Sequence, residues 1–205
     1  MKIGIIISGR GSNMVAIIEA VQSGLIPDSK VTVVISDKTS AEGLIKANER
    51  GIETLAITRK GRAREEHDAE IIAELQKRNV GLICLAGYMR LLSKEFIRAF
   101  PDKIINIHPS LLPSFKGLDA QRQAIDYGVK VSGCTVHFVD EALDHGAIIA
   151  QKTVEVKDED TVESLSARIL EYEHELYVEA VKRIAEGKVE IVGRRVISVK
   201  TLISN

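Results

Sequence analysis

Cysteine is scarce in this sequence, and long apolar runs are missing from it. The two cysteines among 205 residues, Cys84 and Cys134, lie far apart and have no C-x-x-C spacing. Such a pair is typical of buried free thiols in a reducing compartment. No run approaches the roughly 20 apolar residues of a membrane-spanning helix, and the apolar run at residues 2–7 is too short for a signal peptide. The sequence therefore predicts a soluble, cytoplasmic protein.

An excess of either charge is also missing. The chain has 28 Lys and Arg residues against 29 Asp and Glu residues, so electrostatics gives no reason to expect nucleic acid as a partner. With 205 residues, 45% of them hydrophobic, the chain suits one domain of ordinary size with a well-filled core. No linker, repeat or low-complexity stretch divides it.

A glycine-containing loop follows the first predicted strand. Residues 3–7 form a continuous apolar run, typical of a strand covered on both faces, and S-G-R-G-S-N at 8–13 separates it from a buried helix predicted at 14–21. Backbone N–H groups converge at such a turn and the helix dipole favours negative charge, so phosphate binding is favoured over a mere tight turn. A dinucleotide motif would need glycine in place of Met14, although Asp37 could supply its acid. A dinucleotide-dependent oxidoreductase is therefore weakened but not eliminated.

The strand-then-helix order repeats through the first half of the chain. Further strands are predicted at 31–35, 52–57, 80–86 and 103–105, with helices at 41–50, 66–78 and 93–100. Such steps predict a parallel sheet with helices on both faces and right-handed crossovers. In the helix at 66–78 we predict an apolar side made of Ala69, Ile72, Ala73 and Gln76, with His67 exposed.

Two loops in this half carry candidate ligand contacts. The basic segment 58–64 is predicted to be a solvated loop, one of whose arginines could reach an anionic ligand. The unusually apolar segment 87–92 could line a slot for a flat aromatic ligand or could simply plug the core.

The fifth predicted strand ends at Asn106 and His108, before a proline-rich loop. Open α/β sheets bind ligands at the carboxyl ends of their strands, and residues i and i+2 share one face of a strand. Asn106 and His108 can therefore point into one pocket, where an amide donor binds developing negative charge and an imidazole moves a proton. For an isolated N-x-H the alternative is a polar strand end whose histidine caps a neighbouring group.

The second half predicts paired strands at 133–139 and 147–151, joined by an acidic loop, and a closing hairpin at 189–191 and 196–199. A metal site of Cys134, His137 and Asp140 is excluded by geometry, because positions 134 and 137 of a strand face opposite sides.

A long helix starts at a D-x-x-E pattern from Asp160 and runs to Glu186. Glu173 falls in the middle of its apolar stripe. A carboxylate there must be paired, hydrogen-bonded or bound to a ligand, because leaving it bare is costly. A buried ion pair and a ligand contact both remain open. The stripe itself consists of Val162, Leu165, Ile169, Leu176, Ala180 and Ile184.

Taken together, these segments closely resemble the folate-dependent glycinamide ribonucleotide formyltransferases of purine biosynthesis, over essentially the whole chain. The motifs that carry the resemblance are S-G-x-G-S-N at 8–13, G-Y-M-R-L-L-S at 87–93, N-I-H-P-S-L-L-P at 106–113, G-C-T-V-H-F-V at 133–139, D-x-G at 144–146 and E-H at 173–174.

The resemblance implies an α/β fold, with a Rossmann-like parallel sheet covered by helices on both faces and extended by antiparallel strands and a long C-terminal helix. Residues 1–205 would form a single formyltransferase domain, with a nucleotide- and phosphate-binding half at 1–100 and a catalytic and folate-binding half at 101–205. The implied reaction moves the formyl group of 10-formyltetrahydrofolate to the amine of glycinamide ribonucleotide, the third step of de novo IMP synthesis. No metal is implied, and a homodimer is possible.

The resemblance also assigns residues to roles. The catalytic residues would be Asn106, His108 and Asp144, with Asp144 favouring the charged imidazole of His108. Glycinamide ribonucleotide would be bound by Gly11, Ser12, Asn13, Leu170 and Glu173. The folate would be bound by Arg64, Met89, Arg90, Leu91, Leu92, Asn106, Asp140, Glu141, Leu143 and Asp144.

Two related activities and two departures from the family pattern remain. Methionyl-tRNA formyltransferases carry a further C-terminal domain, and formyltetrahydrofolate deformylases, which are hydrolases, normally carry an N-terminal regulatory domain; we expect neither here. A non-catalytic nucleotide-binding module would explain only the loop at 8–13. Asp119 stands where many members have histidine, and Lys116 where many have proline. We expect Asp119 to cap the following helix.

Overall fold

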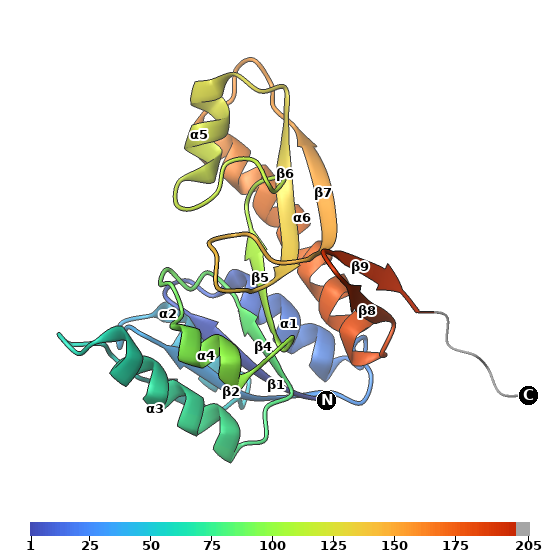
Figure 1. Cartoon of the computed structure of the whole chain (residues 1–205). Coiled ribbons are helices and arrows are strands. Elements are labelled where there is room, and N and C mark those ends of the chain that lie inside the picture. The colour runs from blue at the N-terminus through green and yellow to red at the C-terminus, as the bar shows by residue number, and fades with distance from the viewer. Residues whose placement is uncertain (200–205) are drawn as a thin grey trace, which may run out of the picture.

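The computed structural model describes residues 1–199, whose strands form one nine-stranded mixed sheet (Figure 1). The strand order is β3-β2-β1-β4-β5-β6-β7-β9-β8. The strands are β1 (Lys2–Ile7), β2 (Lys30–Ser36), β3 (Thr54–Ala56), β4 (Leu82–Leu85), β5 (Ile104–His108), β6 (Val131–Phe138), β7 (Ile148–Glu155), β8 (Val189–Val192) and β9 (Arg195–Ser198). The helices are α1 (Ser12–Gln22), α2 (Glu42–Glu49), α3 (Arg64–Lys77), α4 (Lys94–Ala99), α5 (Ala120–Tyr127) and α6 (Val162–Ala185).

The first five strands are parallel, as their continuous apolar runs predict. The chain builds outward from β1 to β2 and β3, then returns to the other side of β1 with β4 and β5. The loops after β1 and β4 therefore leave the sheet in opposite directions. Such a switch point opens a crevice at the carboxyl ends of the strands, where ligands of α/β sheets bind.

Helices cover both faces of this parallel part (Figure 1). Ile3, Ile5 and Ile7 of β1 belong to the buried cluster that contains α1 and α6, whereas Ile6 belongs to the cluster that contains α3 and α4. Side chains alternate across a strand, so an apolar run without polar interruptions is what a doubly covered strand requires. The predicted fold class is confirmed.

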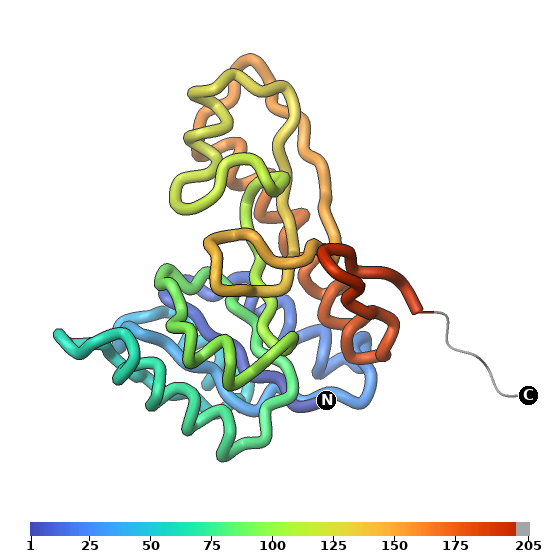
Figure 2. The backbone as a smooth tube through the Cα atoms, viewed as in Figure 1, coloured from blue at the N-terminus to red at the C-terminus, as the bar shows by residue number. Residues whose placement is uncertain are grey.

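Beyond β5 the sheet becomes mixed. β6 runs antiparallel to both β5 and β7, and the two strands rise with α5 into an arm above the parallel part (Figure 1). Residues 139–147 form a loop at the base of this arm (Figure 2), closed by a hydrogen bond from Phe138 N to Ala147 O at 2.9 Å. The predicted closing hairpin is confirmed as β8 and β9, and β9 pairs with β7.

The long helix was predicted with the right buried face but the wrong cap. The buried residues of α6 include Leu165, Ile169, Glu173 and Leu176. Its N-cap is Thr161, whose hydroxyl accepts from Ser164 N at 3.2 Å. Asp160 lies one position earlier and instead pairs with Arg168, which holds the pKa of the Asp160 carboxyl well below its usual range.

The exposed position predicted for His67 is wrong. His67 is 1% exposed, and its Nε2 lies 2.8 Å from the carbonyl oxygen of Ile57, to which it donates. The buried residues of α3 are His67, Asp68, Ile71 and Leu75, while Ala69, Ala73 and Gln76 are exposed. Positions 67, 71 and 75 are four residues apart and so lie on one side of the helix. This side buries the large aliphatic side chains Ile71 and Leu75.

Both cysteines are buried free thiols, as predicted. Burial raises the pKa of the Cys134 thiol to about 12 and also raises that of Cys84, so neither is a reactive thiolate near neutral pH. Across residues 1–199, no helix combines the length and the apolar character that crossing a membrane requires.

Candidate active site

The glycine loop ends at a helix N-terminus built to accept an anion. Gly11 is the N-cap of α1 with φ of 72°, and no side chain among residues 1–199 caps this end. The first backbone N–H groups of a helix have no intrahelical acceptor, so those after Gly11 remain available. A Cβ at Gly11 would lie 2.9 Å from Cα of Gly43, and Gly43 N donates to Gly9 O at 3.0 Å. The loop therefore needs glycine to lie against α2.

Asn13 joins this loop to the long C-terminal helix. Its Nδ2 donates to Glu173 Oε2 at 2.7 Å, and both residues are 7% exposed. The other amide atom, Asn13 Oδ1, is buried and has no hydrogen-bond partner among residues 1–199. Burial raises the pKa of the Glu173 carboxyl, while the hydrogen bond from Asn13 acts in the opposite direction.

The geometry therefore argues against the buried ion pair that the sequence left open for Glu173. Within the described chain it forms no ion pair but is hydrogen-bonded to a neutral amide. Leu170, also predicted to contact the nucleotide, lies half-buried on α6, one turn before Glu173.

Asn106 is oriented by a histidine on the neighbouring strand. Asn106 of β5 pairs with His137 of β6, and Asn106 Nδ2 lies 3.3 Å from His137 Nε2. The other ring nitrogen, Nδ1, lies 2.7 Å from the carbonyl oxygen of Phe138 and must donate to it. Burial lowers the pKa of His137, so its Nε2 carries a lone pair that accepts from the Asn106 amide. This bond leaves the second amide N–H for another acceptor.

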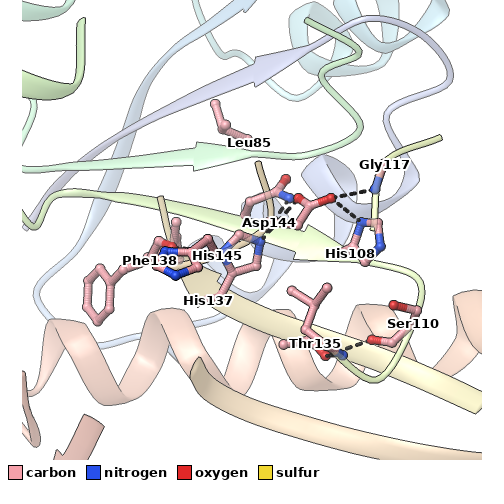
Figure 3. Close-up of polar contacts among 12 residues, drawn as sticks. Leu85, His108, Ser110, Gly117, Thr135, His137, Phe138, Asp144 and His145 are labelled. Atoms are coloured by element: carbon pink, nitrogen blue, oxygen red, sulfur yellow. Dashed lines mark hydrogen bonds and ion pairs between the residues drawn. The ribbon is translucent and has the colours of Figure 1, made fainter. Parts of the chain in front are cut away.

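His108 and Asp144 meet beside this pair (Figure 3). His108 Nδ1 lies 3.5 Å from Asp144 Oδ2, and His108 Nε2 donates to Phe115 O at 2.8 Å. Asp144 Oδ2 also accepts from Gly117 N at 2.8 Å, and its Oδ1 lies 3.7 Å from His137 Nε2. The Asp144 side chain is 9% exposed. One carboxylate thus faces two imidazoles.

The loop at 139–147 holds Asp144 in this position. Asp144 adopts a left-handed backbone with φ of 45°. Two residues later, a Cβ at Gly146 would lie 1.9 Å from the carbonyl oxygen of Phe138, so the loop returns to β6 only with glycine there. Asp140 Oδ2 pairs with His145 Nδ1 at 2.7 Å, and the Arg194 guanidinium donates to His145 O at 2.8 Å.

The predicted folate contacts lie on several loops around these residues. Met89, Leu91 and Leu143 are exposed by 62%, 54% and 48%, and Leu92 is half-buried. Large apolar side chains left in water at a strand end suit a flat organic ring. Arg64 is not in the basic loop as predicted but is the exposed first residue of α3.

Charged residues predicted to contact the folate are already paired within the protein. Glu141 lies 3.5 Å from Lys94 and 3.4 Å from Arg98 of α4. Arg90 Nε donates to Asp37 Oδ2 at 2.6 Å, and the Asp37 side chain is 2% exposed. Asp37 is therefore not available to a ribose, which argues against the oxidoreductase alternative.

The predicted residues thus form two hydrogen-bonded groups, one at α1 and α6 and one at β5, β6 and the loop at 139–147. Tyr177 joins α6 to β4 and β5, because its hydroxyl lies 3.0 Å from Leu85 O and 3.1 Å from Ile105 O. His137 was missed as a site residue. Its pairing with Asn106 depends on strand register, which the spacing of residues in one strand does not reveal.

The N-cap position predicted for Asp119 is confirmed, but its side chain does not cap the helix. Asp119 is the N-cap of α5 by position, but its φ is 56° and its side chain makes no capping hydrogen bond within the described chain. In the left-handed region the side chain does not take the extended geometry of a capping residue.

Residues 1–199 hold no cluster of three or more His, Cys, Asp or Glu side chains that could bind a metal ion.

The chain is similar to known proteins over most of its length. The family model described as formyl transferase matches residues 1–181. The phosphoribosylglycinamide formyltransferase of Haemophilus influenzae is 42% identical over 93% of this chain and 90% of its own length. A crystal structure of glycinamide ribonucleotide transformylase 1 from Symbiobacterium toebii has 49% identity and a TM-score of 0.95, covering 98% of this chain and 94% of that one.

A longer relative matches as well. The trifunctional purine biosynthetic protein adenosine-3 of Gallus gallus is 45% identical over 93% of this chain, but the chain spans only 19% of that protein's length. The family model matches most of the chain, and the bacterial relative matches over nearly its whole length. The chain belongs to the formyl transferase family.

Proposed function

We propose that this chain transfers a formyl group from 10-formyltetrahydrofolate to the primary amine of glycinamide ribonucleotide. The observation that carries the proposal is the meeting of Asn106, His108 and Asp144 at the carboxyl end of β5. The three come from two separate segments of the chain, and their side chains supply a hydrogen-bond donor, a proton carrier and a charge. Acyl transfer to an amine needs these three functions.

The nucleotide is bound by the loop at α1 and by the carboxylate on α6. Backbone N–H groups after Gly11 receive the phosphate, because they lack intrahelical acceptors and lie at the positive end of the helix dipole. Asn13 Oδ1 and Glu173 then accept from the hydroxyl or amine groups of the ligand. A buried carbonyl oxygen without a partner among residues 1–199 supports this role, since leaving it unpaired costs about 1–3 kcal/mol.

The folate is bound by residues 89–92, by the loop at 139–147 and by Arg64. The exposed Met89, Leu91 and Leu143 offer apolar contact to a planar ring. Arg64 is exposed at the start of α3 and can pair with a carboxylate of the ligand.

The residues around the formyl carbon divide the chemistry among them. When the amine attacks, negative charge develops on the formyl oxygen, and the free N–H of Asn106 donates to it. His108 takes part in the proton exchange, because the attacking amine loses a proton while the folate nitrogen gains one as its bond to the formyl carbon breaks. Asp144 holds the His108 ring from the Nδ1 side, with its Oδ2 3.5 Å from that nitrogen.

The reaction is tested by offering three acceptors. Purified protein is mixed with 10-formyltetrahydrofolate and with glycinamide ribonucleotide, water alone or charged initiator tRNA, and tetrahydrofolate and formylated product are measured. We expect tetrahydrofolate and formyl-glycinamide ribonucleotide in equal amounts, only in the first mixture. Formate release independent of the nucleotide would instead make the protein a hydrolase, and formylated tRNA would make it a tRNA enzyme.

We also place this reaction in the cytoplasm. The two buried free cysteines support a reducing compartment, and the near balance of charges gives no reason to invoke nucleic acid. The predicted homodimer remains a prediction.

A further inference from the structure

Ser8 lies where the two proposed substrate loops meet. It is the first residue after β1, and the glycine loop proposed for the phosphate begins at the next position. Across the switch point, β4 ends at Leu85 and is followed by the segment 87–92 proposed for the folate ring. Ser8 is only 4% exposed, so its side chain faces the protein and not the ligand.

Its hydrogen bonds continue the β1–β4 ladder past the end of the strands. Ala86 N donates to Ile6 O at 2.9 Å, and Ser8 N donates to Gly87 O at 3.1 Å. These two backbone bonds do not depend on the side chain at position 8. The next bond does, because Met89 N donates to Ser8 Oγ at 3.0 Å. The hydroxyl therefore takes the place of a backbone acceptor where the two chains begin to diverge.

Tyr88 is buried and Leu92 half-buried against the core cluster that contains α3 and α4, but other side chains of the segment 87–92 are open to solvent. Met89 and Leu91 are exposed by 62% and 54%, and Gly87 adopts φ of 77°. Ser8 holds the start of the segment, and an ion pair between Arg90 and Asp37, the residue after β2, holds its middle. Ser8 is also tied to the phosphate loop, since the adjacent Gly9 accepts from Gly43 N at 3.0 Å and so is held against α2. A shift in either loop changes the geometry at Ser8.

From these contacts we propose that Ser8 is a positioning residue that couples the nucleotide subsite to the folate subsite. The proposal rests on the proposed function, because it assigns the two loops to the two substrates. Binding of the nucleotide restricts the motion of the loop at 9–13. The hydrogen bond from Met89 N to Ser8 Oγ then restricts the motion of the segment 87–92. The folate then meets a segment that is already in place, so that less ordering entropy is lost on its binding.

The test compares the Ser8→Ala variant with the wild-type protein by steady-state kinetics in which the concentrations of both substrates are varied. A single lost hydrogen bond weakens binding by about three- to tenfold. We expect the KM for 10-formyltetrahydrofolate at saturating nucleotide to rise by about that factor. Because coupling between two binding sites is reciprocal, the nucleotide KM at saturating folate should rise equally, with kcat changed less than about twofold. We also expect the Kd of tetrahydrofolate, measured by calorimetry, to respond less to added nucleotide than in the wild type.

Two further variants keep the result interpretable. Thr161→Ala removes a comparable hydroxyl acceptor of a backbone N–H, at the cap of α6, and should leave the folate KM unchanged. Ser8→Cys keeps the size of the side chain with a weaker acceptor and should give an intermediate folate KM; it replaces Ser8→Ala should that variant fail to fold.

An unchanged folate KM in Ser8→Ala, an unchanged response of the tetrahydrofolate Kd to added nucleotide, or the same rise in Thr161→Ala would overturn the coupling role. These outcomes require an active wild type. A wild type that transfers no formyl group to the nucleotide would instead overturn the proposed function.

Discussion

A single amide, that of Asn106, shows how the site is prepared before any substrate binds. The neutral His137 ring accepts one of its N–H groups, because the other ring nitrogen of His137 is engaged with Phe138 O. The orientation of the amide is thereby determined by the protein, and its second N–H needs no rearrangement to meet an oxyanion. Such preorganised donors contribute most of their effect in the transition state.

Replacing Asn106 with alanine tests that effect. We expect Asn106→Ala to lower kcat by about 10²–10³-fold, the usual loss for a removed oxyanion donor, while the melting temperature changes little because the side chain is only half-buried. Asn48→Ala, which removes an exposed amide from α2, serves as the matched control. A kcat within a factor of about three of the wild type would remove Asn106 from the mechanism.

Glu173 has two opposing effects. Its carboxylate is proposed to strengthen nucleotide binding, whereas its burial destabilises the folded protein. Because burial raises its pKa in the folded state, the folded protein retains a proton that the unfolded chain has already released. The protein is therefore destabilised as pH rises from the ordinary value of 4.5 through the raised pKa. Below 4.5 both states are protonated and this penalty disappears.

Glu173→Gln should separate the two effects. The amide can still accept from Asn13 but carries no charge, so we expect the ligand-free protein to gain about 0.5–2 kcal/mol of unfolding free energy at pH 7, with a smaller gain near pH 4. We also expect at least about tenfold weaker nucleotide binding. Urea unfolding and calorimetry measure the two quantities, and Glu171→Gln, exposed on the same helix, is the control. Unchanged nucleotide affinity would leave Glu173 with a structural role alone.

Among the elements, the loop at 139–147 has a strict steric requirement. It delivers Asp144 to His108 and returns to β7 by passing Gly146 against the carbonyl oxygen of Phe138. A built Cβ at 1.9 Å from that oxygen cannot be accommodated without moving the backbone. The position of the carboxylate therefore depends on a residue that has no functional group.

Gly146→Ala should consequently impair catalysis through geometry. We expect kcat to fall by at least about 10²-fold, because a misplacement of about 1 Å in a reacting group costs that much, together with a lower melting temperature. Gly81→Ala is the control, since its Cβ would meet neighbours only at 3.7 Å and 3.8 Å. Full activity in Gly146→Ala would show that the loop closes in another way and that Asp144 is not held as described.

The helix α3 shows where element-level prediction succeeds and where it fails. Its existence follows from composition and spacing, but its buried face was assigned to the wrong side. His67 is polar and was predicted to be exposed, whereas His67 and the neighbouring Asp68 are both buried and hydrogen-bonded, His67 to Ile57 O and Asp68 to Ser93 N. Polar residues that find partners within the fold can be buried as readily as apolar ones, and those partners are not visible in the helix itself.

At the scale of the whole molecule, the alternation of strands and helices was enough to predict the parallel sheet. That ligands bind at the carboxyl ends of its strands stays a prediction. The pairings that build the site were not predictable from spacing. Asn13 and Glu173 are 160 positions apart, and the register of β6 that brings His137 to Asn106 is set by packing on both faces of the sheet. The resemblance to a family supplied the roles of these residues, and the structure supplied their distances.

The account depends on the nucleotide amine and the formyl carbon meeting between these residues. A crystal structure of the protein with glycinamide ribonucleotide and a non-transferring folate analogue measures this directly. We predict the phosphate at the N-terminus of α1, and the atom equivalent to the formyl oxygen within hydrogen-bond distance of Asn106 Nδ2, beside His108. A folate ring bound away from the segment 87–92 and the loop at 139–147, with Asn106 and His108 contacting neither ligand, would contradict it.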